Sequence, residues 1–233
     1  MDVDELADRA RSLAATGDGR AVLGITGPPG AGKSTLTEHL LHVLGPTPPA
    51  GIAPEGWLAH LPMDGFHLAD DELNRLGRRD RKGAPDTFDA AGYAATLRRI
   101  VEGEDDVVYA PAFERTLEQP IAGSIPVTRA ARLVITEGNY LLLDDGDWRH
   151  VRQQLTQTWY CDLDEGERLA RLVDRHERFG KKPAAALAWA TGTDQRNADL
   201  IAVTRSRADL VIPSAVIRGI GAAPATSRAS TRS

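Results

Sequence analysis

The sequence of 233 residues predicts a layered α/β fold, in which a parallel β-sheet is flanked by helices. Short apolar runs of strand length alternate with longer segments of helical composition, and parallel strands need such helical crossovers to connect them. A glycine-rich turn lies directly between the first apolar run and the first long helical segment that follows it. The length suits one domain, because a globule of this size buries roughly 70–75% of its unfolded surface.

The expected elements can be justified in chain order. Apolar residues at helical spacing between Val3 and Ala14 predict a short amphipathic helix at the N-terminus. Runs of strand length occupy residues 21–26, 57–63, 107–110, 133–136, 158–163 and 208–212. Segments of helical length occupy residues 33–44, 90–102, 165–178 and 184–190. Asp164 followed by Glu167 is typical of a capping pair, in which the aspartate accepts an early backbone N–H of the helix.

These elements divide the chain into three parts. We expect an N-terminal helix within residues 1–18, an α/β domain at 19–213 with a helical lid at about 168–190, and a disordered tail at 214–233. Residues 219–233 contain no acidic side chain and few large apolar ones. Burial in such a segment cannot offset the entropy lost on ordering it.

The composition excludes several classes of protein. The 28 basic and 33 acidic residues give a net charge of −5, which disfavours binding to nucleic acid or to an anionic membrane surface. Cys161 is the only cysteine, so neither an intramolecular disulfide nor a four-cysteine zinc site can form. The acidic N-terminus and the lack of a long apolar run argue against a signal peptide or a membrane span. We expect a cytoplasmic protein, and a homodimer is left open.

The turn after the first predicted strand carries the strongest chemical signal. Its sequence GPPGAGKS matches the phosphate-binding pattern G-x-x-x-x-G-K-[ST], known as the P-loop. Glycines let backbone N–H groups surround phosphate oxygens, and the following helix directs its positive end at the same anion. Thr35 replaces the third glycine of the pattern G-x-G-x-x-G, which disfavours a dinucleotide-binding fold. We expect the nucleotide phosphates to be bound by Gly27, Gly30, Ala31, Gly32, Lys33, Ser34 and Thr35.

Three side chains have the chemistry to act on the phosphates and their metal ion. Lys33 places a cation against the β- and γ-phosphates, and Ser34 offers a hydroxyl to Mg²⁺. Glu137 follows the buried run LVIT, where a carboxylate suits a second position linked to Mg²⁺, through water. An ordinary turn acid is the alternative for Glu137.

Asp64 and His67 follow the second predicted strand, in the segment MDGFH. An acidic residue at the carboxyl edge of an open α/β sheet lies beside the ligand crevice. Asp64 could therefore accept a proton from an alcohol that attacks the γ-phosphate, or it could cap N–H groups of its own loop. His67 could contact a substrate or be an ordinary loop histidine.

Four arginines recur on one predicted helix. Arg168, Arg171, Arg175 and Arg178 are spaced so that they share a helix face, and a basic, glycine-containing stretch follows them. The pattern indicates a lid whose cations close over the transferring phosphoryl group. The alternative is a solvated face whose arginines pair with neighbouring acids.

The combination of segments resembles a known superfamily. The segments are GITGPPGAGKST, PMDGFH, RKGAPDTFD, VVYAPAFER, ITEGNYLLL and TRSRADLVI, and together they span roughly residues 21–213. They resemble the superfamily of uridine kinases, phosphoribulokinases and type I pantothenate kinases. Within it, the sequence is most similar to a bacterial group described as nucleoside/nucleotide kinase-like or fructose-transport kinase-like.

The resemblance implies ATP as the phosphoryl donor, Mg²⁺ as its metal ion and a small hydroxylated molecule as the acceptor. It implies Asp64 as the catalytic base and Glu137 as an acidic residue beside the metal. Arg171 and Arg175 match the arginines of the lid. The residues that it places at or near the acceptor are Lys82, Asp86, Phe88, Asp89, Tyr109 and Asn139.

Departures from the superfamily leave the acceptor open. Residues 82–89 are similar to a pantothenate kinase segment, whereas residues 108–115 depart from the pattern of those enzymes. No pyrimidine-contacting pattern of uridine kinases is recognisable. We expect a kinase that phosphorylates a hydroxyl of a sugar, a nucleoside or a pantothenate-like metabolite. The alternative is a regulatory NTPase without a small-molecule acceptor.

Overall fold

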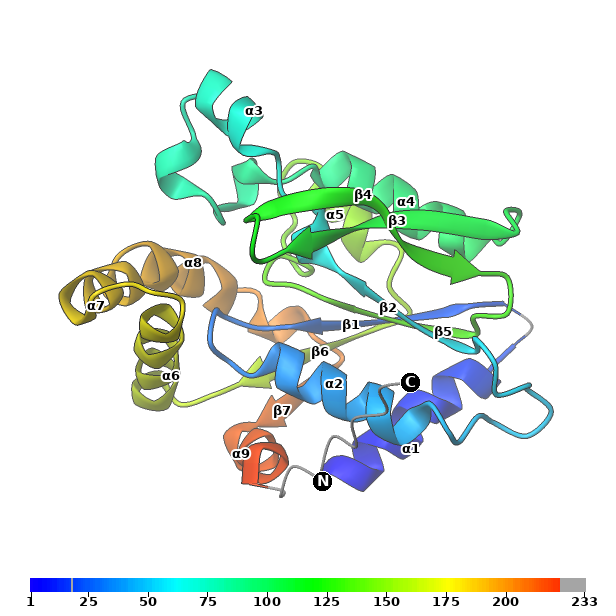
Figure 1. The fold of residues 1–233 in the computed structure, drawn as a ribbon. Coiled ribbons are helices and arrows are strands. Elements are labelled where there is room, and N and C mark those ends of the chain that lie inside the picture. The colour runs from blue at the N-terminus through cyan, green and yellow to red at the C-terminus, as the bar shows by residue number, and fades with distance from the viewer. Residues whose placement is uncertain (18, 223–233) are drawn as a thin grey trace, which may run out of the picture.

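The centre of the molecule is a sheet of five parallel strands, in the order β2-β5-β1-β6-β7. The computed structural model describes residues 1–17 and 19–222. The strands are β1 (Ala21–Thr26), β2 (Leu58–Pro62), β5 (Leu133–Glu137), β6 (Gln157–Asp162) and β7 (Leu210–Pro213). This arrangement confirms the predicted parallel α/β fold with helices on both faces of the sheet (Figure 1).

Burial of the sheet on both faces explains the continuous apolar runs in the sequence. All six residues of β1 are buried, and so are the first four of β5. Successive residues of a strand then belong to different cores: Val22 packs in one cluster and Leu23 in the other. The register pairs Ile25 and Pro62 with Glu137, which places this glutamate at the carboxyl edge of the sheet.

Two layers cover the sheet (Figure 1). One consists of α1 (Val3–Ala15), α2 (Lys33–Leu44) and α9 (Ser214–Ala222). The other consists of α4 (Ala90–Glu102), α5 (Trp148–Arg152) and the hairpin of β3 (Val107–Glu114) and β4 (Gln119–Thr128). The remaining helices, α3 (Asp70–Arg75), α6 (Glu165–Arg178), α7 (Pro183–Thr191) and α8 (Thr193–Ala202), lie near the end of the sheet where β1 leads into α2.

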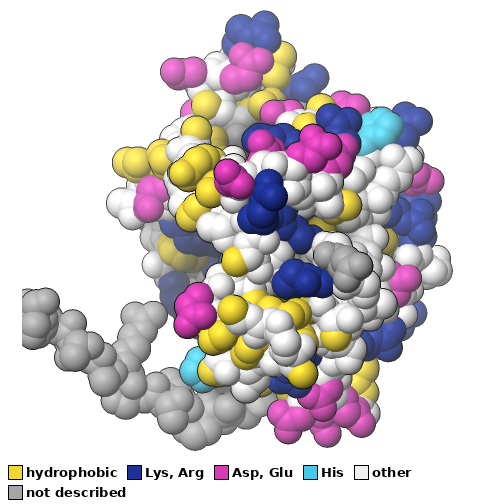
Figure 2. Space-filling model, turned by 90° about the vertical axis from the view of Figure 1, so that its right-hand side faces the viewer, with side chains coloured by type: hydrophobic (Ala, Val, Ile, Leu, Met, Phe, Trp, Pro, Cys, Tyr) yellow, Lys and Arg dark blue, Asp and Glu magenta, His cyan; other side chains and the backbone are white. Residues whose placement is uncertain are grey.

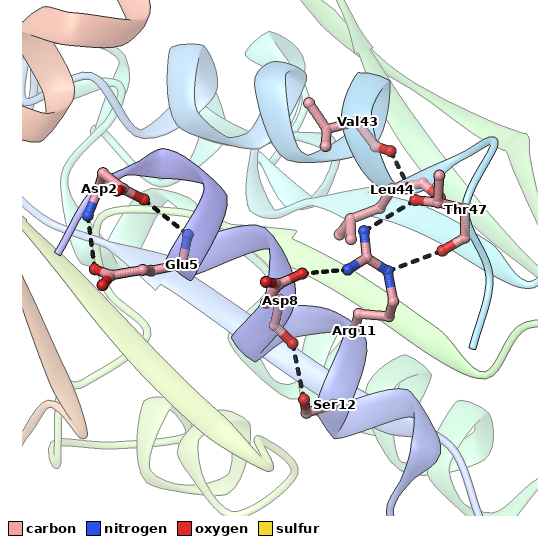
Figure 3. A network of polar contacts seen from close by, with 8 residues as sticks. All are labelled: Asp2, Glu5, Asp8, Arg11, Ser12, Val43, Leu44 and Thr47. Carbon is pink, nitrogen blue, oxygen red and sulfur yellow. Dashed lines mark hydrogen bonds and ion pairs between the residues drawn. The ribbon is translucent and has the colours of Figure 1, made fainter. Parts of the chain in front are cut away.

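The N-terminal helix is attached to the end of α2 by polar contacts (Figure 3). Asp2 and Glu5 form a capping box, in which each side chain accepts a hydrogen bond from the other residue's backbone N–H. Arg11 donates from Nε to the carbonyl of Thr47 and from Nη2 to its hydroxyl, both at 3.0 Å. Helix α1 therefore confirms the amphipathic helix predicted between Val3 and Ala14.

The hairpin differs from the expectation for residues 107–110. This segment pairs antiparallel with β4 outside the parallel sheet, and a register shift interrupts the pairing between Ala110 and Ala112. Strand β4 was not predicted, because most of its residues are exposed and it contains two prolines and a glycine, which are typical of turns. The hairpin covers α4 and the sheet with one face only, so its sequence lacks a continuous apolar run.

The prediction of a disordered tail is wrong for its first nine residues. Ser214–Ala222 form helix α9, whose Val216, Ile217 and Ile220 are buried against the α1–α2 layer. These apolar residues share one helix face and supply the burial that the composition of the whole segment obscures. Residues 223–233 of the predicted tail lie outside the described residues.

The face at the amino ends of the strands carries both acidic and basic side chains, which surround a patch of hydrophobic side chains below the centre of the view (Figure 2). Within the part of the chain that the structure describes, no helix has the length and apolar character needed to cross a membrane.

Candidate active site

The phosphate-binding turn connects β1 directly to α2, as its sequence requires. Helix α2 begins at Lys33, so its free N–H groups point into the turn. Gly32 has a φ of 88°, and a Cβ atom there would lie 2.5 Å from Cγ2 of Ile217. Both the backbone conformation and the packing of α9 therefore require glycine at this position. The turn and the helix start form an anion-binding site.

Lys33 lies across the mouth of this turn. Its Nζ donates to the carbonyl oxygens of Gly27 and Pro28, at 2.9 and 3.0 Å. Burial lowers the pKa of Lys33 to about 8, and the charge of Glu137 opposes that shift. The lysine is therefore mostly protonated at neutral pH, but it loses its charge at a lower pH than an exposed lysine.

Ser34 and Glu137 bring two oxygen ligands together beside Lys33. The Ser34 hydroxyl donates to Oε2 of Glu137 at 2.8 Å, and His60 Nε2 lies 3.7 Å from Oε1, beyond hydrogen-bond distance. Burial raises the pKa of Glu137, but His60, Ser34 and the Lys33 charge together outweigh it and leave that pKa below its usual value. Glu137 is thus ionised at neutral pH.

This oxygen pair suits Mg²⁺. The ion prefers hard oxygen ligands and usually takes only one or two from a protein. Among residues 1–17 and 19–222, no group of three or more His, Cys, Asp and Glu side chains is arranged to hold a metal ion. A magnesium ion here would therefore depend on phosphate and water for its other ligands.

Asp64 stands at the carboxyl end of β2, in the short 3-10 helix Met63–Phe66. Its carboxylate is 45% exposed. A Cβ atom at Gly65 would overlap the carbonyl oxygen of Pro111, so only glycine lets this turn approach β3. His67 donates its backbone N–H to the Asp64 carbonyl at 3.2 Å, and its Nδ1 lies 2.8 Å from the same oxygen. The turn thus fixes the backbone of Asp64 and leaves its carboxylate open to the cleft.

One cleft of about 540 Å³ unites these residues. Its walls come from the phosphate-binding turn, the Asp64 turn, residues 79–88, the hairpin turn, the end of β5 and the α6–α8 helices. The predicted site residues that line it are Lys33, Ser34, Asp64, His67, Lys82, Phe88, Glu137, Asn139 and Arg175. The volume is sufficient for a small-molecule ligand.

Three residues predicted near the acceptor lie elsewhere. Asp86 faces outward and is paired with Arg81 at 2.7 Å. Asp89 caps α4 by accepting from the N–H of Gly92 at 2.8 Å. Tyr109 is 63% exposed and does not line the cleft. Of their immediate neighbours in the sequence, Phe88 lines the cleft, next to Asp89. Val108 and Ala110, on either side of Tyr109, are buried in the core instead.

The arginines of α6 do not share one role. Arg175 lines the cleft, and Arg171 lies beside Gly32, where its guanidinium pairs with Glu167 at 2.7 Å. Arg168 is only 3% exposed, and it donates to the carbonyl of Pro29 at 3.4 Å and to Gln195. Arg178 pairs with Asp174 on the exposed side of the helix. Arg168 therefore supports the phosphate-binding turn from behind, and Arg175 is the α6 arginine that faces the cleft.

Several lining residues were not predicted. His176 and Asp194 form a pair at 2.7 Å between α6 and α8, and both side chains are nearly buried. They are eighteen positions apart and belong to different helices, so no local pattern could identify them. The other unpredicted polar and aromatic residues on the wall are Arg79, Phe113, Arg115, Glu118, Phe179, Trp189, Thr193 and Asn197. Lys181, from the basic stretch predicted to follow the α6 arginines, also lines it.

Known proteins share both the sequence and the fold. The "Uncharacterized protein YggC" of Escherichia coli is 34% identical over 193 residues, which cover 83% of this chain and 77% of that protein. The "Putative uridine kinase C227.14" of Schizosaccharomyces pombe is 31% identical over 219 residues, which cover 92% and 89%. No protein-family model matches the chain.

Solved structures of P-loop kinases also have a fold similar to that of this chain. The structure described as a putative fructose transport system kinase from Silicibacter sp. TM1040 has a TM-score of 0.80 and 34% identity, and the match covers 91% of this chain and all of that one. YFH7 from Saccharomyces cerevisiae, described as a putative P-loop containing kinase, has a TM-score of 0.75 at 18% identity, and covers 91% and 98%; this likeness shows the fold alone.

The fold and the phosphate-binding turn define a protein of the P-loop kinase class. Its relatives place it more narrowly. The chain belongs to the superfamily of uridine kinases, phosphoribulokinases and type I pantothenate kinases, as its sequence segments predict.

Proposed function

We propose that this protein transfers the γ-phosphoryl group of ATP to a hydroxyl of a small metabolite. The observation that carries the proposal is the position of Asp64, on the wall of the same cleft as Lys33 and the Ser34–Glu137 pair. A P-loop protein that only hydrolyses nucleotide has no need of a carboxylate beside space for an acceptor in the same cleft. The names of the relatives support a kinase and leave its acceptor open.

The donor half of the cleft binds and neutralises the triphosphate. Backbone N–H groups of the turn and the Lys33 ammonium contact the β- and γ-phosphates. Ser34 and Glu137 hold Mg²⁺, which neutralises charge on the phosphates when it is bound. Arg175 faces the cleft from α6 and stabilises the charge that spreads over the equatorial oxygens as the phosphoryl group moves.

The acceptor half orients the attacking hydroxyl. Asp64 accepts a hydrogen bond from that hydroxyl and takes its proton as the new oxygen–phosphorus bond forms and ADP leaves. Catalysis consists mainly of positioning and charge stabilisation, because phosphoryl transfer needs little covalent help from the protein. Helices α6–α8 form one wall of the cleft and exclude water from that side.

Turnover with and without acceptors tests this proposal. The purified chain is incubated with ATP and Mg²⁺, alone and with a panel of sugars, nucleosides, sugar acids, sugar phosphates and pantothenate-like alcohols. We expect ADP release to rise at least tenfold with a suitable acceptor and a product heavier by one phosphoryl group. ADP release at the same rate in every mixture, with inorganic phosphate as the product, would show instead a regulatory NTPase.

A further inference from the structure

The acceptor half of the cleft contains three cationic side chains from two separate segments. Arg79 belongs to the short 3-10 helix Arg79–Arg81, Lys82 follows it, and Arg115 comes from the turn of the β3–β4 hairpin. All three line the cleft on the side of Asp64 and outside the phosphate-binding turn. We propose that they recognise an anionic group, a carboxylate or a phosphate, on the alcohol that is phosphorylated. This inference rests on the proposed kinase function.

Contacts with Asp70 hold the side chains of Arg79 and Lys82 in place. Lys82 is 11% exposed, and its Nζ lies 2.6 Å from Oδ1 of Asp70 and 2.5 Å from the carbonyl oxygen of Glu118. Arg79 Nη2 lies 2.8 Å from the other oxygen of the same Asp70. One carboxylate thus serves two cations, and it does not itself line the cleft. The arrangement fixes both cations and leaves N–H groups of Arg79 free for a ligand.

The hairpin turn brings the third cation to the same wall. Glu118 has a φ of 54°, a conformation that non-glycine residues rarely adopt, and its carbonyl oxygen accepts from Lys82. Gln119 accepts from the backbone N–H of Asp70 at 3.2 Å. These two contacts attach the turn to residues 70–82. Backbone strain at a position that is held by such contacts is typical of functional sites.

Of the three cations, Arg115 has the most N–H donors available for an anion. Its side chain is 60% exposed, and its Nη2 lies 4.0 Å from Oδ2 of Asp64, too far for a hydrogen bond. Within the described part of the chain, the guanidinium makes this one long ion pair with Asp64 and no hydrogen bond, so its planar set of N–H donors is available on the cleft wall. Such a fork matches the two oxygens of a carboxylate or phosphate.

Net charge alone does not carry the argument, because Asp64 and Glu118 lie on the same wall and Asp70 lies behind it. The decisive feature is the kind of group that each side chain offers. Asp64 is engaged by the attacking hydroxyl in the proposed reaction, and the arginines can only donate. Near the lid, Asp194 and Asn197 can bind further hydroxyls. The acceptor class is therefore a hydroxylated acid or a sugar phosphate.

Matched acceptors and two variants test the inference. The acceptors are one sugar, its terminal phosphate ester and the corresponding sugar acid, each assayed with ATP and Mg²⁺. We expect kcat/KM for one of the anionic forms to exceed that of the neutral sugar at least tenfold. Arg115→Gln and Arg79→Gln should reduce this preference about 10- to 100-fold, mainly by raising KM. Arg115→Lys should restore part of it, and Arg98→Gln, on the exposed side of α4 and paired with Glu102, is the control.

Binding measurements separate the inference from the proposed reaction. The same acceptors are titrated calorimetrically into the full chain with Mg²⁺ and a non-hydrolysable ATP analogue. Tighter binding of the phosphate or the acid than of the neutral sugar, lost in Arg115→Gln, supports the anion site even if no acceptor is phosphorylated. Equal binding of charged and neutral forms, or equal losses for both in Arg115→Gln, would overturn it. Comparing the titration of the sugar phosphate with that of the sugar acid decides between phosphate and carboxylate as the recognised group.

Discussion

The nucleotide half of the cleft comes mainly from one continuous stretch, Gly27 to Ser34, whereas the acceptor half comes from segments far apart in the sequence. In the first half, local backbone conformation and the start of α2 create the site. In the second half, the hairpin turn, residues 79–88 and helices α6–α8 create it by packing together. The chemistry of the donor site is therefore encoded locally, and that of the acceptor site depends on the whole fold.

The largest expected effect lies in the nucleotide half. Lys33→Ala removes the cation that faces the β- and γ-phosphates, so we expect kcat/KM to fall roughly 10³-fold or more. ATP affinity, measured by calorimetric titration, should fall as well. Lys182→Ala is the matched control, because Lys182 is exposed and does not line the cleft. ATP binding by Lys33→Ala at the wild-type level would contradict the assignment of the phosphate site.

The next effect distinguishes two arginines of one helix. Arg175→Ala should lower kcat roughly 10²-fold and leave the free energy of unfolding nearly unchanged. Arg168→Ala should lower that free energy by about 1–3 kcal/mol, because it leaves the Pro29 carbonyl and Gln195 without their donor. Urea denaturation and steady-state kinetics measure the two effects. If both variants changed kcat and the free energy of unfolding by equal amounts, the separate roles given to Arg175 and Arg168 would be contradicted.

The pH dependence of ATP affinity gives a smaller effect with a defined sign. Burial lowers the pKa of Lys33 to about 8, so its ammonium, and with it ATP binding, should be lost as the pH rises from 7 to 9. We expect Kd to rise up to about tenfold per pH unit above the pKa. Stability responds in the opposite sense: between pH 8 and 10.5 the unfolded chain binds the extra proton, so this group makes the fold more stable as the pH rises.

Lys33→Arg supplies the control for this pH effect. An arginine keeps its charge over the whole range, so the variant should show a flat pH dependence of Kd even if its affinity is lower. A decline with pH as steep as in the wild type would assign the titration to another group.

The smallest effect lies in the acceptor half. Tyr109→Ala should change kcat/KM less than twofold, because the side chain is exposed and outside the cleft. A matched kinetic comparison with Phe113→Ala, which removes an aromatic ring from the cleft wall of the same hairpin, should show a clearly larger loss. A large loss for Tyr109→Ala alone would restore the role that the family resemblance implies for it.

The same contrast explains what the sequence could predict. The parallel sheet could be predicted from its apolar runs of strand length. The turn at Gly27–Ser34 and the carboxylates Asp64 and Glu137 could then be located because each follows such a run at the carboxyl edge of the sheet. Strand β4 could not be predicted, since it is mostly exposed. Helix α9 is buried along a single face of a segment that is otherwise rich in small and polar residues.

Tertiary contacts account for the remaining differences at the site. Asp86, Asp89 and Tyr109 belong to segments that do reach the cleft, but their own side chains do not line it: Asp86 pairs with Arg81, Asp89 caps α4 and Tyr109 is exposed. A resemblance assigns segments more securely than it assigns the direction of each side chain. The cations Arg79 and Arg115 escape sequence analysis for a related reason: only the docking of the hairpin turn on residues 70–82 brings them together.

The central claim is that Asp64 is the base of a phosphoryl transfer to an alcohol, and the variant Asp64→Asn tests it most directly. The amide keeps the size of the side chain but cannot accept the proton, so kcat should fall about 10²- to 10⁴-fold. The Kd for ATP should stay within about twofold, since the phosphate-binding turn is intact. Asp71→Asn, on the exposed surface of α3, serves as the control. An unchanged kcat in Asp64→Asn would contradict the assignment.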